Sequence, residues 1–434
     1  MGAEIELSFN DLLANGQAVG RLAGQVVFVF GPLPLERARV RVTSLKANYA
    51  VGQLLDLIVQ SPDRAIPFCP VFGRCGGCQV QHLSYAAQLT WKQNVVRNAL
   101  ARIAGLKDAN VSFPIGMDNP RAYRNKMSLV VDRSSQNANV GFYKQRSHEM
   151  VAIDGCPIVL PQLNGYIPVL RNAAADARHI VARAGQSTGN AVITFTTPRR
   201  SHAAAIAGQS ILHKLPGAVG IANSFELAGE NAILGRKFAV LAGKEHIEER
   251  IGGIRYRISA GSFFQVNSEI VGRIFLFLKS KMGSKRQLVD LYCGAGTFSL
   301  FFAQLGASVW GVEENGSAIR EAQANARLNG LEPLLHFYRA RVEDAVQRNP
   351  IRAALAAAES VFLDPPRKGT DERTLQAIAA ANVREVWYLS CDAATLARDI
   401  KVLALAGYTV RTIQPFDMFP QTGHIETLAM LTKE

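Results

Sequence analysis

The later part of the chain alternates short apolar segments with segments of helical periodicity, and this alternation constrains the fold more than any other feature. After Gly261 the two kinds of segment follow each other repeatedly. Strands are expected at 287–292, 309–313, 335–338, 360–364 and 385–390, and helices at 298–305, 315–329, 371–380 and 393–406. Such alternation is typical of a parallel, doubly wound sheet. We therefore predict an α/β, Rossmann-like domain over residues 259–434.

The first 60 residues have a different pattern. Residues 5–9 and 38–42 alternate apolar and polar side chains, and residues 26–30 form an apolar run. Glycines separate these segments, and short strands with glycine turns predict a small β-barrel over residues 1–60. Between the two lies a central α+β domain, residues 61–258. Its sequence predicts one helix over 84–105, able to pack on the last domain, then mostly strand and loop from 121, with a second helix near 164–184.

The net charge of the 434-residue chain is +13, which bears on its partner. A surplus of this size favours a polyanion, most simply nucleic acid, although a merely basic protein is an alternative. No signal peptide is evident at the N-terminus, and no apolar run approaches the roughly 20 residues that span a bilayer. We expect a cytoplasmic monomer with no membrane partner.

Four of the six cysteines predict a metal centre. Cys69, Cys75 and Cys78 form a C-x5-C-x2-C pattern, and Cys156 follows in a Gly-Cys-Pro turn. Clustered cysteines in an intracellular protein indicate metal ligands rather than disulfides. A lone distant fourth cysteine favours a [4Fe–4S] cluster, because zinc sites usually combine two paired knuckles. Two alternatives stay open: a zinc site, or no metal at all. For a metal centre, a structural role is simpler than a catalytic one.

A glycine loop follows the first strand of the α/β domain. Gly294 and Gly296 stand between strand and helix, where the backbone can approach a ligand closely. Ser299 replaces the third glycine of the dinucleotide fingerprint, which favours S-adenosylmethionine, a ligand without phosphate. Glu313 ends the next strand, where a carboxylate can hold both ribose hydroxyls. Cys293, within the loop, is expected to be a small residue without chemistry.

Further along the chain, reactive side chains follow two neighbouring strands. Asp364 precedes two prolines that fix a rigid turn, and Cys391 ends the next strand. A thiolate there can add to C6 of a uracil, which makes C5 nucleophilic toward the methyl group of S-adenosylmethionine. A base must then remove the C5 proton. Glu426 is the candidate, since burial would raise its pKa toward neutrality. Taken alone, Cys391 would more often be a core cysteine and Glu426 an ordinary surface residue.

Together these residues resemble the RNA 5-methyluridine methyltransferases over nearly the whole chain, specifically the iron–sulfur branch that acts on 23S ribosomal RNA. The resemblance implies an N-terminal OB-like TRAM barrel, a central iron–sulfur domain and a C-terminal class I methyltransferase domain. It also implies S-adenosylmethionine and a [4Fe–4S] cluster as cofactors and RNA as the partner.

The resemblance implies a role for each matching residue. The cluster ligands would be Cys69, Cys75, Cys78 and Cys156. The cofactor-binding residues would be Gln265 of the Phe263-Phe264-Gln265-Val266-Asn267 motif, Tyr292, Gly294, Gly296, Thr297, Glu313 and Asp364. Cys391 would be the nucleophile and Glu426 the base. The segment Tyr123-Arg124-Asn125-Lys126 resembles one that lies near the RNA in the family.

Two positions depart from the family pattern. Cys391 is followed by Asp392 and Ala393, where the family reads Cys-Asn-Pro, and the extra carboxylate is expected to raise the pKa of the thiol. Arg341 stands where some relatives carry an asparagine that contacts the cofactor, so that contact is not transferred.

The predicted function is methylation of C5 of one uridine in RNA, with 23S rRNA as the expected substrate. The target base must leave its stack to be reached. Alternatives are a transfer-RNA uridine methyltransferase and an RNA-binding or assembly factor with impaired catalysis. N6-adenine methylation is disfavoured because Arg367 replaces the aromatic residue after Asp-Pro-Pro. A radical iron–sulfur enzyme is disfavoured because a C-x3-C-x2-C signature is absent.

Overall fold

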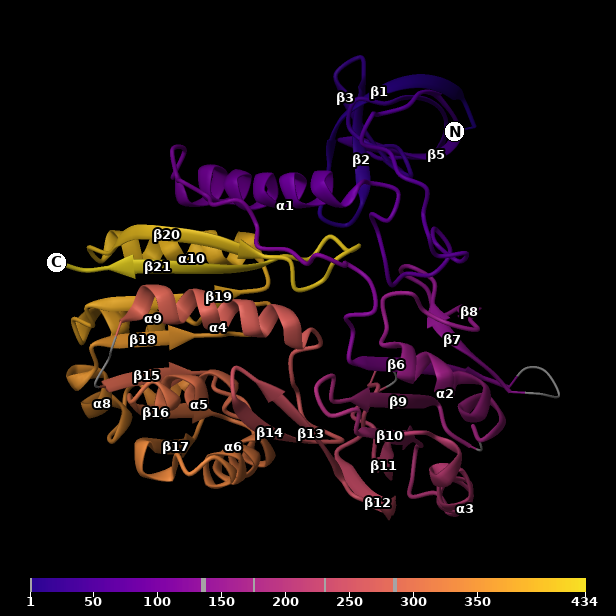
Figure 1. Ribbon diagram of the computed structural model, residues 1–434. Coiled ribbons are helices and arrows are strands. Elements are labelled where there is room, and N and C mark those ends of the chain that lie inside the picture. Colours follow the sequence, from indigo (N-terminus) through magenta and orange to yellow (C-terminus); the bar gives the residue numbers. More distant parts are fainter. Residues whose placement is uncertain (1, 134–137, 175, 230–231, 284–286) are drawn as a thin grey trace.

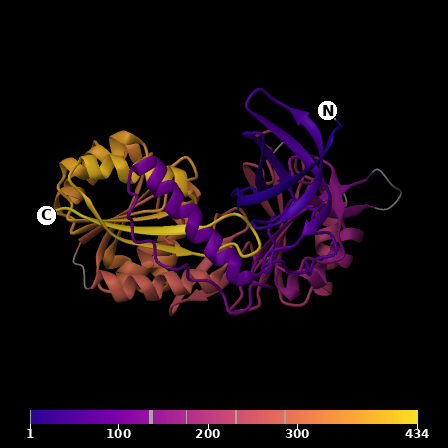
Figure 2. The ribbon, with the colours of Figure 1, turned by 90° about the horizontal axis from the view of Figure 1, so that it is seen from above.

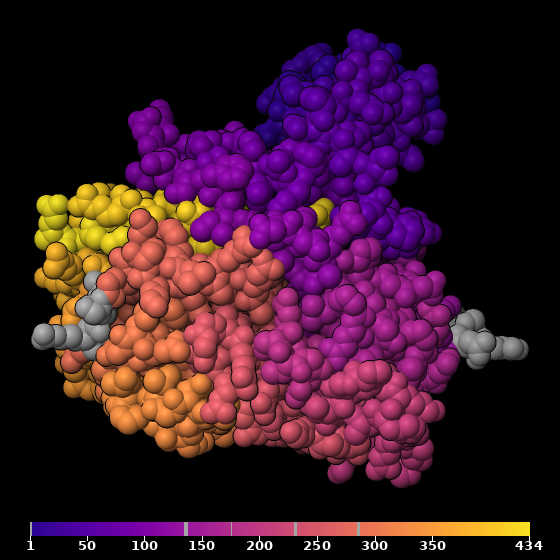
Figure 3. Space-filling model, viewed as in Figure 1, coloured from indigo at the N-terminus to yellow at the C-terminus, as the bar shows by residue number. Residues whose placement is uncertain are grey.

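A computed structural model describes residues 2–133, 138–174, 176–229, 232–283 and 287–434. Figure 1 shows three parts: an N-terminal barrel, a central sheet below it, and an α/β part that carries the C-terminus. In Figure 3 the barrel stands as a separate lobe on the other two parts, which adjoin each other. In the described part of the chain, no helix has the length and apolarity that crossing a membrane requires.

The N-terminal strands close into the predicted barrel, in the order β1-β2-β3-β5-β4. They are β1 (Glu4–Leu12), β2 (Gln17–Leu22), β3 (Gln25–Phe30), β4 (Arg37–Leu45) and β5 (Tyr49–Val59). The alternating pattern points one face of each strand inward, and Phe9, Val29 and Val40 are fully buried there.

The central part is built on a seven-stranded sheet, in the order β12-β11-β10-β9-β6-β7-β8. Its strands are β6 (Lys126–Asp132), β7 (Asn139–Tyr143), β8 (Met150–Ala152), β9 (His179–Ala184), β10 (Ala191–Thr196), β11 (Ala218–Phe225) and β12 (Lys237–Gly243). Helices α2 (Pro161–Asn172) and α3 (His202–Ile211), followed by the 3-10 turn η2 (Leu212–Lys214), pack on one face through residues such as Leu163 and Ile211.

The prediction of a helix near 164–184 is wrong for the second half of this range. Helix α2 ends at Asn172, and residues 179–184 form β9 in the middle of the sheet. The β-branched Ile180 and Val181 favour an extended chain, and β9 pairs with β6 on one side and β10 on the other. Pairing on both sides overrides a local pattern that resembled a helix.

The C-terminal part is a seven-stranded sheet with helices around it, in the order β17-β16-β15-β18-β19-β21-β20. Its strands are β15 (Gln287–Leu291), β16 (Ser308–Glu313), β17 (Leu335–Arg339), β18 (Ser360–Leu363), β19 (Glu385–Ser390), β20 (Thr409–Phe416) and β21 (Glu426–Thr432). Its helices are α4 (Ser268–Met282), α5 (Thr297–Gln304), α6 (Gly316–Leu328), α7 (Val342–Ala345), α8 (Ile351–Ala357), α9 (Glu372–Ala380) and α10 (Ala393–Leu405), with a 3-10 turn η3 (Glu332–Leu334).

All five strands and four helices predicted after Gly261 are present, within one or two residues of their expected ends. The sheet is parallel from β17 to β19, as predicted. The sequence did not reveal that β21 inserts antiparallel between β19 and β20, or that α4 precedes the sheet. A hairpin of β13 (His246–Ile251) and β14 (Ile254–Ser259) joins the central part to α4. The apolar residues of the hairpin and of α4 belong to one core.

Helix α1 (Tyr85–Ala99), extended by the π-helical turn η1 (Leu100–Ala104), reaches from the barrel to the far sheet (Figure 2). On the barrel side the indole of Trp91 donates to the carbonyl of Leu12, at 2.8 Å. At the other end Val96 and Leu100 belong to the core of the α/β part. Between them the Nζ atom of the fully buried Lys92 lies 2.5 Å from Oδ1 of Asp417. One short helix therefore connects the beginning of the chain to its end.

Replacing Lys92 by Ala is expected to destabilise the fold by about 3–5 kcal/mol, because it leaves the Asp417 carboxylate buried without its counter-charge. Urea unfolding of the full chain, followed by tryptophan fluorescence, measures the loss. Asn98→Ala, an exposed change on the same helix, is the control and should shift stability by less than about 0.5 kcal/mol. Equal effects of the two changes would contradict the assignment.

Candidate active site

The carboxyl ends of the parallel strands open into a cavity of about 620 Å³. Ligands bind at this edge in doubly wound sheets. Eight of the predicted site residues line it: Gln265, Tyr292, Gly294, Thr297, Glu313, Asp364, Cys391 and Glu426. Gly296 does not line the cavity. It begins α5 with a φ of 84°, where an added Cβ would lie 2.7 Å from a Leu300 methyl group, so its role is in the turn.

The glycine turn after β15 is tied to the end of β16. The amide of Gly294 lies 3.3 Å from Oε2 of Glu313, and the amide of Asn315 donates to Oε1 at 2.7 Å. Both carboxylate oxygens are thereby oriented, and each has lone pairs left for hydroxyl donors. Beneath the turn, Ser299 donates to the buried Asp290 at 2.5 Å. The serine that replaces the third glycine thus secures a carboxyl group whose pKa burial raises to about 8.

The loop after Asp364 is held by a buried network. Oδ2 of Asp399 accepts from the amide of Thr370 at 2.8 Å and from the hydroxyl of Tyr388 at 2.6 Å. The neighbouring Arg398 donates to the carbonyl of Lys368 at 3.0 Å. Asp399 is 1% exposed, so the loop is fastened to the inside of the domain. This fixes the loop that carries Arg367 at the cavity wall.

Two carboxyl groups in the cavity have pKa values near neutrality. Burial raises the pKa of Asp364 to about 7. Burial, and then the charge of Asp364, raise the pKa of Glu426 to about 8, while Arg367 opposes the rise. Glu426 is the first residue of β21, and no described residue pairs with its Oε2 atom. A carboxyl group in this state can accept and release a proton near pH 7.

Cys391 directly follows β19 and is half-buried. The pKa of its thiol is raised to about 11, mainly by burial. The charges of Glu426 and Asp364 add to this rise, and the charge of Arg367 opposes it. The carboxylate of Asp392 caps α10 instead, accepting from the amides of Ala394 and Thr395, both at 2.9 Å. Burial, rather than the expected Asp392, is therefore the main cause of the raised thiol pKa.

Sequence reasoning missed three residues of the cavity wall. Phe419 and His424 lie on the loop before β21, and Arg367 was not among the predicted site residues. Burial and Arg367 lower the pKa of His424 to about 4, so the ring is neutral at pH 7. Its Nε2 atom lies 3.3 Å from a guanidinium nitrogen of Arg367. The place of His424 two residues before Glu426 was the available signal.

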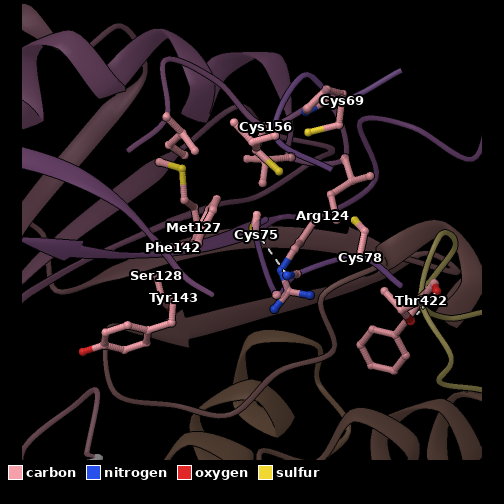
Figure 4. A pocket seen from close by; sticks show the side chains of 18 of the residues that line it. Cys69, Cys75, Cys78, Arg124, Met127, Ser128, Phe142, Tyr143, Cys156 and Thr422 are labelled. Carbon is pink, nitrogen blue, oxygen red and sulfur yellow. Dashed lines mark hydrogen bonds between the residues drawn. The ribbon is translucent and has the colours of Figure 1, made fainter. Parts of the chain in front are cut away.

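A second cavity, of about 410 Å³, adjoins the first, and Arg367, Phe419 and His424 line both. The cysteines Cys69, Cys75, Cys78 and Cys156 line the second cavity, and Figure 4 shows their side chains gathered around a common space. Among the described residues, no three histidine, cysteine or acidic side chains are placed to hold a metal ion. Four thiols are nevertheless a donor set of the kind that soft metal centres use.

Comparisons with known proteins agree with this geometry. The model of the tRNA (uracil-5-)-methyltransferase family matches residues 234–434, and that of the TRAM domain matches residues 1–55. An uncharacterized RNA methyltransferase of Halalkalibacterium halodurans is 38% identical over 98% of this chain and 96% of its own length. Another, of Thermosynechococcus vestitus, is 37% identical over 99% and 98%. The chain therefore belongs to the S-adenosylmethionine-dependent RNA methyltransferases of the uracil-C5 family.

A solved structure has the same fold. The tRNA (uracil-54, C5)-methyltransferase of Pyrococcus abyssi, in complex with S-adenosyl-L-homocysteine, superposes with a TM-score of 0.78. The match covers 99% of this chain and 100% of that one, at 24% identity. The barrel at the N-terminus is thus a TRAM domain, and the C-terminal sheet has a methyltransferase fold.

The raised pKa of Glu426 predicts a pH-dependent effect of Glu426→Gln on stability. The folded protein holds the proton up to about pH 8, whereas the unfolded chain releases it near 4.5, so ionisation costs stability increasingly between these pH values. The variant lacks this cost. The difference in Tm between the variant and the wild type should therefore increase from pH 5 to pH 8 and stay constant above pH 8. Scanning calorimetry tests this, with the exposed Glu372→Gln as control. A gain independent of pH would refute the assignment.

Proposed function

We propose that the protein transfers the methyl group of S-adenosylmethionine to C5 of one uridine in 23S rRNA, with Cys391 as nucleophile and Glu426 as base. One observation carries the proposal: a thiol and a buried carboxyl group with a free oxygen line the same cavity as the glycine turn and Asp364. Uracil C5 is a weak nucleophile, and this combination supplies what it lacks, namely covalent activation at C6 and a base for the C5 proton.

The cofactor is proposed to lie along the glycine turn. Glu313, oriented by Gly294, would accept hydrogen bonds from the ribose hydroxyls. Tyr292, Thr297, Asp364 and Gln265 would complete the site, because they line the same cavity. Gly296 would shape the turn from beneath. Bound there, S-adenosylmethionine supplies an electrophilic methyl group.

The proposed reaction runs in three stages: addition of the thiol, methyl transfer and elimination. The Cys391 thiol loses its proton, and its sulfur bonds to C6 while the electron pair moves to C5 and the O4 carbonyl. C5 then bonds to the methyl carbon, and S-adenosylhomocysteine leaves. Glu426 takes the C5 proton, the C5–C6 double bond forms again, and the sulfur departs. With a pKa of about 11 the free thiol is protonated at pH 7, so its proton must pass to a neighbouring base or to solvent.

The choice of RNA rests on the cysteines. Four thiols around one cavity support membership of the iron–sulfur branch, for which 23S rRNA is the expected substrate. The TRAM barrel and the charge of +13 suit any RNA. Transfer RNA is the second candidate, because the Pyrococcus neighbour acts on it. Mapping 5-methyluridine in RNA from a deletion strain distinguishes the two. We also propose that residues 1–60, 61–258 and 259–434 act as the RNA-gripping, cluster-bearing and methyl-transferring units of a monomer.

RNA carrying 5-fluorouridine at the target should trap the enzyme. Fluorine replaces the C5 proton that Glu426 removes, so the reaction stops after methyl transfer with the sulfur still bound to C6. A denaturing gel should show a stable protein–RNA adduct that depends on S-adenosylmethionine. Cys391→Ala should abolish the adduct, whereas Cys293→Ala, in the buried turn, should retain it. An undiminished adduct in Cys391→Ala would rule out this nucleophile.

Protein purified without oxygen is expected to be brown, with the broad visible absorption of an iron–sulfur cluster. Iron and sulfide should be present at about four per chain, as a cubane cluster requires. Cys78→Ser should lose the colour, while Cys293→Ser should keep it. A colourless protein that contains zinc would overturn the cluster assignment and support the zinc alternative.

A further inference from the structure

The central sheet has an apolar face and a polar face. Because side chains alternate along a strand, Leu129, Ile180 and Phe195 point to the helices α2 and α3. The residues next to them point the other way, and those of the three middle strands are mostly polar: Lys126, Ser128, His179, Arg183, Thr194 and Thr196. Part of this face is covered, since Val192 belongs to the core that includes β13, β14 and α4, so the polar groups beside it require polar partners.

Several polar atoms on this face are buried without a protein partner. The Nη1 atom of Arg183, the Nδ1 atom of His179 and the Oγ1 atom of Thr196 have no hydrogen-bond partner among the described residues. The exposed fractions of these side chains are 5%, 6% and 0%. An unsatisfied buried polar group costs about 1–3 kcal/mol, so three on one sheet face indicate a ligand that satisfies them.

Two of the residues are cations placed side by side. Lys126 and Arg183 are direct partners in the antiparallel pairing of β6 with β9. Burial, Arg183 and Arg124 together lower the pKa of Lys126 to about 8. Within the described ranges no carboxylate lies within ion-pair distance of either cation, and Glu321 acts on Arg183 only at longer range. Like charges directly opposite each other destabilise a sheet unless an anion joins them.

The polar face is next to the candidate active site. The cysteine-lined cavity continues over Lys126, Ser128 and His179, and it shares Arg367 and His424 with the catalytic cavity. In the view of Figure 4, Cys75 lies between Cys69 and the sheet residues Ser128 and Tyr143, so the thiols and the sheet adjoin within one cavity. An anion on the sheet would therefore lie beside the nucleotide that enters the catalytic cavity.

We propose that the polar face of the central sheet, where the cavity reaches Lys126, Ser128 and His179, binds a backbone phosphate of the substrate RNA beside the target uridine, with the buried Arg183 adding positive charge next to Lys126. The inference rests on the proposed function for the identity of the RNA, and on the sheet for the site. A phosphate suits the face, because its oxygens can accept from the Lys126 ammonium, the Ser128 hydroxyl and an imidazole N–H of His179. Held there, the backbone would be fixed while the base is turned toward Cys391.

Filter binding of 23S rRNA from a deletion strain tests the site, using the full-length protein with S-adenosylhomocysteine over a range of salt concentrations. Lys126→Gln should weaken binding and lower the slope of log Kd against log salt by about one, since one phosphate contact is lost. Lys214→Gln is the matched control. Lys214 is exposed and lies in η2, on the opposite side of the same sheet, so binding and slope should stay unchanged.

A second variant separates binding from folding. Arg183→Met should also weaken RNA binding, yet its Tm should not fall, because removing a buried unpaired charge costs little stability. The affinity of both variants for S-adenosylhomocysteine should equal that of the wild type.

The proposal is overturned if Lys126→Gln keeps the wild-type slope, or if RNA and S-adenosylhomocysteine binding fall together with Tm. The same slope change with transfer RNA instead of 23S rRNA would support the site and change the RNA. Failure of the proposed chemistry is a separate result, because it is read from the fluorouridine adduct and not from binding.

Discussion

The geometry of the candidate active site depends on how the loop from Asp417 to Ile425 is held. At the beginning of this loop, the Nζ atom of Lys92 donates to the Asp417 carboxylate at 2.5 Å and to the Phe419 carbonyl at 3.1 Å. Tyr123 donates to the carbonyl of Pro420 at 3.0 Å. This loop carries two residues of the wall between the cavities and leads directly into Glu426. Contacts from about 300 residues earlier in the chain thus place the proposed base.

Burial is the second constraint, and it acts on function and stability in opposite directions. The walls that exclude water raise the pKa values of Asp364, Glu426 and Cys391 to about 7, 8 and 11. Ionising these groups for chemistry costs folding energy, which apolar packing beneath the site offsets. Phe362 and Trp387, on the strands that precede Asp364 and Cys391, are fully buried. Active sites commonly carry such a cost.

The features that could be predicted from the sequence are those set by residues close together in the chain. Strand and helix periods, and the strand ends at Glu313, Asp364 and Cys391, depend on neighbouring residues, so they were predictable. The insertion of β21, and the docking of α1 through the buried Lys92, depend on partners far along the chain and leave no local pattern. The departure at Asp392 was misjudged for a different reason: its carboxylate caps the adjacent N-terminus of α10 instead of facing the thiol, and this is a local contact.

The cysteine segment is joined to the same loop by its backbone. The amides of Gln79 and Val80 both donate to the carbonyl of Gln421, at 3.1 and 3.2 Å. Gln421 has a φ of 72°, a conformation that costs energy for a residue with a side chain and persists only when its surroundings impose it. The segment that follows Cys78 therefore helps to impose the shape of the loop that ends at Glu426. A metal centre among the four thiols would then support catalysis by ordering this segment, without taking part in the reaction.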